Sequence, residues 1–224
     1  MRRYVLPLLG LYLDFIIVSA VVGLAAYLLG QVWSVLSGQG AQWYVEYGVS
    51  AALVGIGRAL GLSAGKYLLA PAREMQDETP PPRRWPNLVL GTFLILDGLK
   101  QMLRWTELDA VIPVFGMVET SAVKAVLLVA MGGLYVVAGG MILRFARGAK
   151  AATITALAIS AASLGLSWSV LPEAIARVQT ARRAAQGMPL RDGEIEMMQT
   201  MLPWIGVGGL VLVGVLAWMS RERK

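Results

Sequence analysis

Four charged side chains interrupt long apolar runs of this sequence, where an unpaired charge is costly in lipid. The first run contains Asp14 and the second contains Arg58. The third contains Asp97, with Lys100 three residues later on the same face of a helix. A carboxylate in such a place can bind a cation or a proton, with the arginine or lysine as its counter-charge. The same residues can instead form permanent ion pairs that fix how the helices pack.

The expected depths of these charges bring them within reach of one another. Asp14 and Asp97 each fall about ten residues from the end of an apolar run, which is roughly 15 Å along a helix. Arg58 falls about six residues, or roughly 9 Å, from the end of its run. The sequence therefore predicts an intramembrane charge cluster of Asp14, Arg58, Asp97 and Lys100. An ion-binding site and a structural ion pair both stay open at this point.

Small residues surround Arg58. Gly57, Gly61 and Gly65 recur at every fourth position, and Lys66 follows the last of them. On a continuous helix this spacing gives a face without bulk, which another backbone can approach closely. We expect a helix-packing and interface motif that ends with Lys66 at the membrane surface.

Composition assigns the chain to a broad class. Hydrophobic residues make up 57% and charged residues 15%, which is typical of a membrane protein. There is no cysteine, which excludes disulfides and thiolate metal sites, and no histidine, the commonest metal ligand and general base. We therefore expect no enzyme, no cofactor and no metal site. The net charge of +6 comes from residues that flank apolar runs, which is typical of membrane proteins and does not indicate nucleic-acid binding.

The apolar runs predict an all-α, polytopic transmembrane bundle of about six spans. Three consecutive prolines, Pro80 to Pro82, mark a loop after the second span. The segment 172–202 is predicted to be a polar loop with a surface helix and a second short helix near Gly193. Pro203 is predicted to open the last span. The predicted spans are approximately 4–29, 44–63, 87–105, 122–145, 151–171 and 204–219.

The basic residues predict the orientation of this bundle. Outside the spans, twelve lysines and arginines lie at the two termini and in the connections on the same side, against five on the opposite side. Because positive charge is retained on the cytoplasmic side, we expect both termini in the cytoplasm. The segment 172–202 is then expected on the far side.

Two stretches of the first 105 residues resemble the RDD family of bacterial membrane proteins. One is Leu11-Tyr-Leu-Asp-Phe-Ile16, with its aspartate inside the first span, and the other is Gly61-Leu-Ser-Ala-Gly-Lys-Tyr-Leu-Leu69. The family typically shows Gly-x-Thr/Ser-x-Gly-Lys-x-Leu-Leu-Gly at the second place, and Ala70 stands here where the last glycine is usual. Asp97 matches a second aspartate of the family.

The resemblance implies a multi-pass protein of the bacterial inner (cytoplasmic) membrane, with cation–proton exchange suggested for some members. Residues 1–105 would form an RDD-like three-span module, and residues 106–224 a second three-span module. Two functions stay open. The chain is a small cation/proton exchanger or solute transporter, or it is a non-catalytic accessory or assembly subunit. Its expected partners are the lipid bilayer and either further copies of itself or a larger membrane complex.

Overall fold

The computed structural model describes residues 2–37, 43–75, 84–104, 113–119, 121–185 and 187–222. These residues form eight helices, which confirms the all-α prediction. The predicted loop at Pro80 to Pro82 lies outside the described residues. The helices are α1 (Arg2–Ser37), α2 (Trp43–Ala59), α3 (Ala64–Glu74), α4 (Trp85–Leu103), α5 (Ala122–Leu143), α6 (Ala149–Ser167), α7 (Leu171–Ala185) and α8 (Glu194–Met219).

Four of these helices are long and apolar enough to cross a membrane, which supports the prediction of a membrane protein. They are the 4–27 part of α1, and helices α5, α6 and α8. A fifth span results if the bent pair α2 and α3 is counted as one. The predicted number of six spans is not confirmed. Helix α4 is long enough but is not among the four, because Asp97, Lys100 and Gln101 lower its mean hydropathy.

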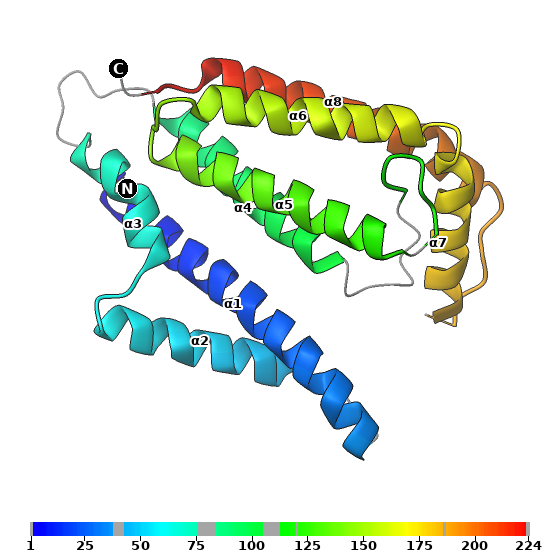
Figure 1. Ribbon diagram of the computed structural model, residues 1–224, viewed down its shortest axis with the longest axis horizontal. Coiled ribbons are helices and arrows are strands. Elements are labelled where there is room, and N and C mark those ends of the chain that lie inside the picture. Colours follow the sequence, from blue (N-terminus) through cyan, green and yellow to red (C-terminus); the bar gives the residue numbers. More distant parts are fainter. Residues whose placement is uncertain are drawn as a thin grey trace.

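Helices α4, α5, α6 and α8 lie side by side and form the larger part of the molecule (Figure 1). Helix α1 runs obliquely past α4, and α2 and α3 pack against α1 (Figure 1). Helix α7 lies across one end of the bundle, and both chain termini lie at the other end (Figure 1). Among these contacts the one between α4 and α5 is the most extensive. Helix α4 thus packs more closely on the second half of the chain than on α1.

Glycines allow α4 and α5 to approach closely. Gly98 faces Gly132, and seven residues away on each helix Gly91 faces Gly139. A methyl group on Gly98 would lie 2.5 Å from the carbonyl oxygen of Gly132, so no larger residue fits there without a shift. Between the two glycine contacts, α4 buries Leu94 among side chains of α5 and α6. In lipid, where apolar surface gives no drive to associate, such backbone contact is a principal source of packing energy.

The predicted row of Gly57, Gly61 and Gly65 does not lie on one helix, and this prediction is wrong. Helix α2 ends at Ala59, and Gly61 adopts a left-handed conformation with φ +78°. Ser63 then begins α3 as its N-cap, since its side chain accepts a hydrogen bond from the backbone N–H of Lys66. The two helices meet at a bend of 55°. The residues of the row are therefore distributed over two helices and the turn between them.

The predicted polar loop at 172–202 is wrong in its second half. The first half is helix α7, in agreement with the expected surface helix. From Glu194 onward, however, the chain forms a single helix through Met219, with Pro203 buried inside it. Proline is tolerated within membrane helices because neighbouring groups satisfy the carbonyl that it leaves without a partner. Pro203 consequently does not mark the start of the last span.

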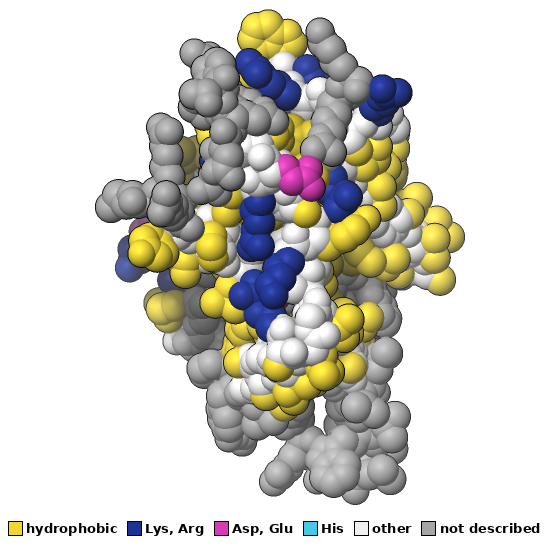
Figure 2. All heavy atoms as spheres, turned by 90° about the vertical axis from the view of Figure 1, so that its left-hand side faces the viewer, with side chains coloured by type: hydrophobic (Ala, Val, Ile, Leu, Met, Phe, Trp, Pro, Cys, Tyr) yellow, Lys and Arg dark blue, Asp and Glu magenta, His cyan; other side chains and the backbone are white. Residues whose placement is uncertain are grey.

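Basic side chains gather at the end of the molecule that carries the termini and α3 (Figure 2). Lys66 and Arg73 belong to α3, and Arg144 and Arg147 to the connection between α5 and α6.

Exposed tryptophans lie on α8 at two well-separated positions. Helix α8 carries exposed Trp204 and Trp218, which at a rise of about 1.5 Å per residue lie roughly 21 Å apart along its axis. Tryptophan is enriched at both membrane interfaces, so this spacing suits a helix that crosses a bilayer.

Candidate functional site

Asp14 lies at the contact between α1 and the bend of α2 and α3. Its side chain is buried, with 4% of its surface exposed. One carboxylate oxygen accepts a hydrogen bond from Arg58 Nε at 2.7 Å and another from Ser63 Oγ at 2.7 Å. The other oxygen accepts a hydrogen bond from the backbone N–H of Gly65, also at 2.7 Å. The structure thus joins Asp14 to Arg58, and three donors surround the carboxylate.

The backbone at the start of α3 shapes this contact. Gly65 presses against Gly10 of α1, where an added methyl group would come within 2.1 Å of the Gly10 carbonyl oxygen. This approach places the N–H of Gly65, in the first turn of α3, directly on Asp14. A helix N-terminus favours a negative charge, so α3 stabilises the ionised carboxylate. Asp14, Arg58, Ser63 and Gly65 are called the elbow clamp below.

Arg58 is only partly engaged in the elbow clamp. Its Nε atom bonds Asp14, while its buried Nη2 atom has no hydrogen-bond partner among the described residues. About 26% of its side chain is exposed. Arg73 of α3 lies nearby, since a methyl group on Gly10 would stand 3.6 Å from Arg58 Nη2 and 3.7 Å from Arg73 Nη2. Two guanidinium groups therefore lie close to the same position of α1.

The structure does not bring Asp97 into the elbow clamp. Asp97 is half-buried on α4 and accepts a hydrogen bond from Gln101 Nε2 at 2.8 Å, one turn along the helix. It faces α5 and α6, whereas Asp14 faces α2 and α3. In the described part of the chain, no ion pair joins Asp97 to Arg58 or to Lys100. The predicted cluster of four charges is therefore divided over separate places.

Asp97 lines a hollow of about 340 Å³ between α4, α5, α6 and α8, called the Asp97 hollow below. Its polar lining consists of Asp97, Gln101, Arg104, Tyr135, Ser160 and Ser163, together with Ser167. The Tyr135 and Ser160 hydroxyls are hydrogen-bonded to each other at 2.7 Å. A hollow of this size with several polar side chains in its wall can hold a small polar solute.

A tight turn stands at one edge of the Asp97 hollow. Val114 and Met117 exchange backbone hydrogen bonds around Phe115 and Gly116, which both have positive φ angles of 48° and 79°. The N–H groups of the two turn residues donate to hydroxyls of α6, Phe115 to Ser163 at 3.1 Å and Gly116 to Ser167 at 3.0 Å. The four-residue spacing of these serines places both hydroxyls on one face of α6, where the turn docks.

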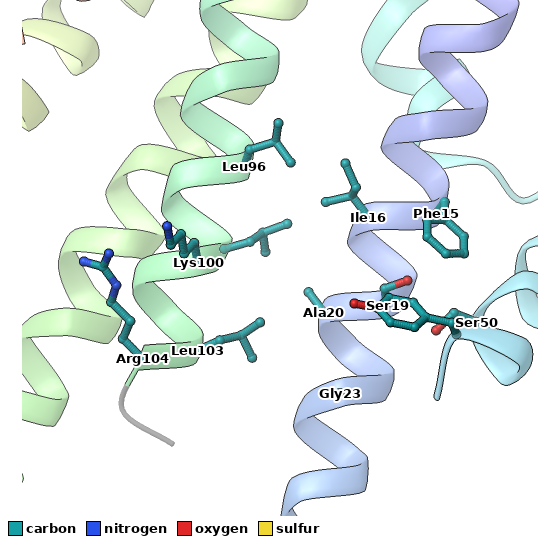
Figure 3. Close-up of a pocket in the computed structure, with 12 residues that line it drawn as sticks. Phe15, Ile16, Ser19, Ala20, Gly23, Ser50, Leu96, Lys100, Leu103 and Arg104 are labelled. Carbon is teal, nitrogen blue, oxygen red and sulfur yellow. The ribbon is translucent and has the colours of Figure 1, made fainter. Parts of the chain in front are cut away.

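Lys100 belongs to a second hollow, between α1 and α4, of about 580 Å³. Leu96 and Leu103 extend toward Ile16 and Ala20 of α1 across this space (Figure 3). Arg104 extends from the other flank of α4, away from α1 (Figure 3). Lys100 and Asp97 are thus only three residues apart, but they line different hollows.

Two buried polar contacts were not predicted from the sequence. Asn87 is fully buried, donates to the carbonyls of Ile142 and Arg221, and accepts from the N–H of Arg221. Glu194 accepts hydrogen bonds from Gln179 and Arg183 and so joins α7 to α8. The sequence contains a signal for each, namely an asparagine inside the third predicted span and acid–base alternation in 173–194. Neither signal indicates which residue would form the contact.

Lys66 lies exposed in the first turn of α3. No group of three or more acidic side chains suitable for a metal ion occurs in the described residues.

Comparisons with protein-family models, with curated proteins and with solved structures find no match. The resemblance to the RDD family accordingly remains a prediction.

Proposed function

We propose that this chain is a small-solute transporter of the bacterial inner membrane that exchanges its solute for protons at Asp97. The observation that carries the proposal is a half-buried carboxylate without a cationic partner in the described residues, on the wall of a hollow that also holds several other polar side chains. A carboxylate at such a depth is costly and commonly marks an ion or proton path. A proton and a positively charged group of the solute would compete for the same oxygens, and this competition couples their movement.

The two intramembrane carboxylates are assigned different tasks. Asp14 is engaged by three donors and holds α1 on the bend of α2 and α3. Releasing it in each cycle would break all three hydrogen bonds, so we assign it a structural role. Asp97 has one neutral hydrogen-bond donor, Gln101, and space beside it. The assignment of exchange to Asp97 alone revises the expectation of a two-carboxylate site.

Flux through reconstituted vesicles tests the proposal. Purified protein is placed in vesicles that contain a pH-sensitive dye, and a sodium, potassium or solute gradient is applied. We expect proton movement with the wild type and none with Asp97→Asn, whose melting temperature in detergent stays close to that of the wild type. Glu173→Gln is the matched control, because Glu173 is an exposed carboxylate paired with Arg177 on α7. Wild-type vesicles that move no protons under any of these gradients would overturn the proposal.

We place both termini in the cytoplasm, in line with the basic end shown in Figure 2. Because the chain has no cysteine, a single introduced cysteine reports orientation cleanly. Met188 is exposed beyond α7, at the opposite end from the termini. A cysteine at Met188 should react with a membrane-impermeant reagent added to whole cells, and one at Arg147 should not. The reverse pattern would contradict this orientation.

A second candidate is an accessory subunit of a larger membrane complex. The observation that favours it is the hollow between α1 and α4, whose walls are mainly apolar and which could receive a membrane-spanning helix of a partner protein (Figure 3). Purification in mild detergent separates the two candidates. Recovery with one partner in fixed proportion supports the accessory role, and recovery as the chain alone or as a homo-oligomer supports transport.

A further inference from the structure

Two opposite charges line the Asp97 hollow without neutralising each other. Asp97 lies on α4, and Arg104 is the residue that caps the C-terminus of this helix, seven residues or about two turns later, roughly 10.5 Å along the axis. Gln101 lies between them and donates to Asp97. No ion pair joins the two charges, and among the described residues no hydrogen bond engages the Arg104 side chain. Only the backbone N–H of Arg104 is bonded, to the carbonyls of Lys100 and Gln101. The hollow thus presents a carboxylate and a guanidinium at separate points of one helix face.

The position of Arg104 limits the charge of any solute in this hollow. A metal cation held by Asp97 would share the hollow with the fixed positive charge of Arg104, which repels it. An anion held by Arg104 would in the same way face Asp97. A molecule with a positive and a negative end satisfies both groups, because each charge can form a charge-assisted hydrogen bond with its opposite.

The remaining lining suits the body of such a molecule. The side chains of Tyr135, Ser160 and Gln101 line the same hollow as the two charges. Leu128 and Leu164 add apolar surface that can contact a short carbon chain. A volume of about 340 Å³ accommodates a small organic solute.

We propose that the Asp97 hollow binds a small zwitterion of the amino-acid class, with its ammonium group at Asp97 and its carboxylate at Arg104. The inference rests on the proposed function for the transport step, but binding to this hollow can be tested separately. It names a substrate class different from the metal cations that the family resemblance implies. Arg104, which the sequence did not single out, becomes a residue that determines specificity.

The binding test uses three molecules with similar carbon chains that differ in which charged groups they carry. The probe is 4-aminobutyrate, whose two charges stand at opposite ends of a short chain, and the controls are butyrate and butylammonium, which each lack one charge. Binding to purified protein in detergent is measured by the shift in melting temperature and by isothermal titration calorimetry. We expect 4-aminobutyrate to bind and each control to bind roughly 10–100-fold more weakly, as for loss of one hydrogen bond to a charged group. Equal binding of all three molecules, or no binding of the probe, would overturn the inference.

Two variants should lose the probe and one should keep it. Asp97→Asn and Arg104→Gln each remove one charge from the hollow, and both should reduce affinity by a similar factor of roughly 10–100. Lys100→Gln is the matched control, because Lys100 lies between the two on α4 but lines the other hollow. Arg104→Lys keeps the charge and should restore part of the affinity. If Lys100→Gln weakens binding as much as Arg104→Gln, the probe does not occupy the Asp97 hollow, and the inference is overturned.

Flux measurements separate this inference from the proposed function. Exchange of one proton for a neutral zwitterion moves one net charge, so an imposed membrane potential should change its rate. Exchange of one proton for a monovalent cation moves no net charge and should not respond. Specific binding of 4-aminobutyrate without any proton movement would support the site and overturn transport. Potential-independent exchange of sodium or potassium, with no binding of the probe, would support transport and overturn the site.

Discussion

Gly98 and Gly132 are in backbone contact across α4 and α5, since a methyl group on either would come within 2.5 Å of the other's carbonyl oxygen. Gly91 and Gly139 repeat the arrangement seven residues away, at 2.9 and 2.7 Å. On both helices the adjoining residues are large, including Leu94 and Tyr135. The two backbones therefore approach closely at two pairs of glycines, and larger side chains of the two helices pack against each other between these pairs. This contact holds α4 in place, and α4 carries Asp97 and Arg104.

We predict that Gly98→Ala and Gly132→Ala each destabilise the protein by about 1–3 kcal/mol, the usual cost of overfilling a packed contact. The matched control is Gly133→Ala, one residue further along α5, where nothing lies within 4 Å of an added methyl group. Alanine is a better helix former than glycine by about 1 kcal/mol, so the control should be neutral or stabilising. Thermal unfolding in detergent measures all three variants. Similar losses for Gly132→Ala and Gly133→Ala would contradict the close approach.

The elbow clamp gives a prediction by double-mutant cycle. Asp14→Asn leaves Arg58 without its counter-charge, and Arg58→Gln does the same to Asp14. Because Arg58 is partly exposed, each loss should fall between the value for an exposed pair, about 0–1 kcal/mol, and that for a buried pair, about 3–5 kcal/mol. The double variant should recover part of the sum. Strict additivity in thermal unfolding would show that the two side chains do not interact.

Gly65 and Gly57 provide a paired test of the bend between α2 and α3. An alanine at Gly65 would collide with the backbone of Gly10 and move the N–H that bonds Asp14. At Gly57 an added methyl group meets only the Leu62 carbonyl oxygen at 3.5 Å, an ordinary contact. We therefore expect Gly65→Ala to lower the yield of folded protein and the melting temperature, and Gly57→Ala to change neither. Tolerance of both changes would mean that α1 and α3 can separate without loss.

Glu194 and Glu173 give a similar contrast at the other end of the molecule. Glu194 is buried and accepts hydrogen bonds from Arg183 at 2.7 and 2.9 Å, from Gln179, and from the N–H of Arg191. Glu194→Gln should cost about 1.5–3 kcal/mol, as for a hydrogen bond to a charged group. Glu173→Gln breaks an exposed pair and should cost less than about 1 kcal/mol. Hydrogen exchange of α7, measured by mass spectrometry, should rise only in the first variant, because α7 then loosens from α8.

The sequence did not predict how the helices are rotated about their axes. Asp14 and Asp97 were expected at the same depth, and the cluster followed from that alone. Depth depends on residue count along a helix, but the neighbour that a side chain faces depends on rotation about the axis and on tertiary packing. The helix break at Gly61 was likewise not predicted, because the region 44–69 is apolar throughout. Hydropathy carries no information on the backbone φ angle. The combination of a glycine and an N-capping serine, Ser63, was the local signal for that break.

Some contacts between distant parts of the chain could not be predicted. The partners Asn87 and Arg221 are 134 residues apart, and nothing near either residue indicates the other. The missing N–H of proline predicts a helix start at Pro203, but the residue lies buried inside α8, as membrane helices allow. The overall class and most helix positions were accessible because they follow from runs of apolar residues. The Asp97 hollow was not, since it is formed by four separate helices.

The C-terminal segment completes parts of the bundle that are synthesised much earlier. The Glu222 carboxylate accepts a hydrogen bond from the N–H of Lys150 in the first turn of α6, at 2.6 Å. The backbone of Arg221 satisfies the buried amide of Asn87. During translation, the hydrogen bonds of Asn87 and of the Lys150 N–H to residues 221 and 222 can therefore form only after α8 has been synthesised. Docking of residues 221 and 222 therefore depends on α4 and α6 already lying side by side with α8.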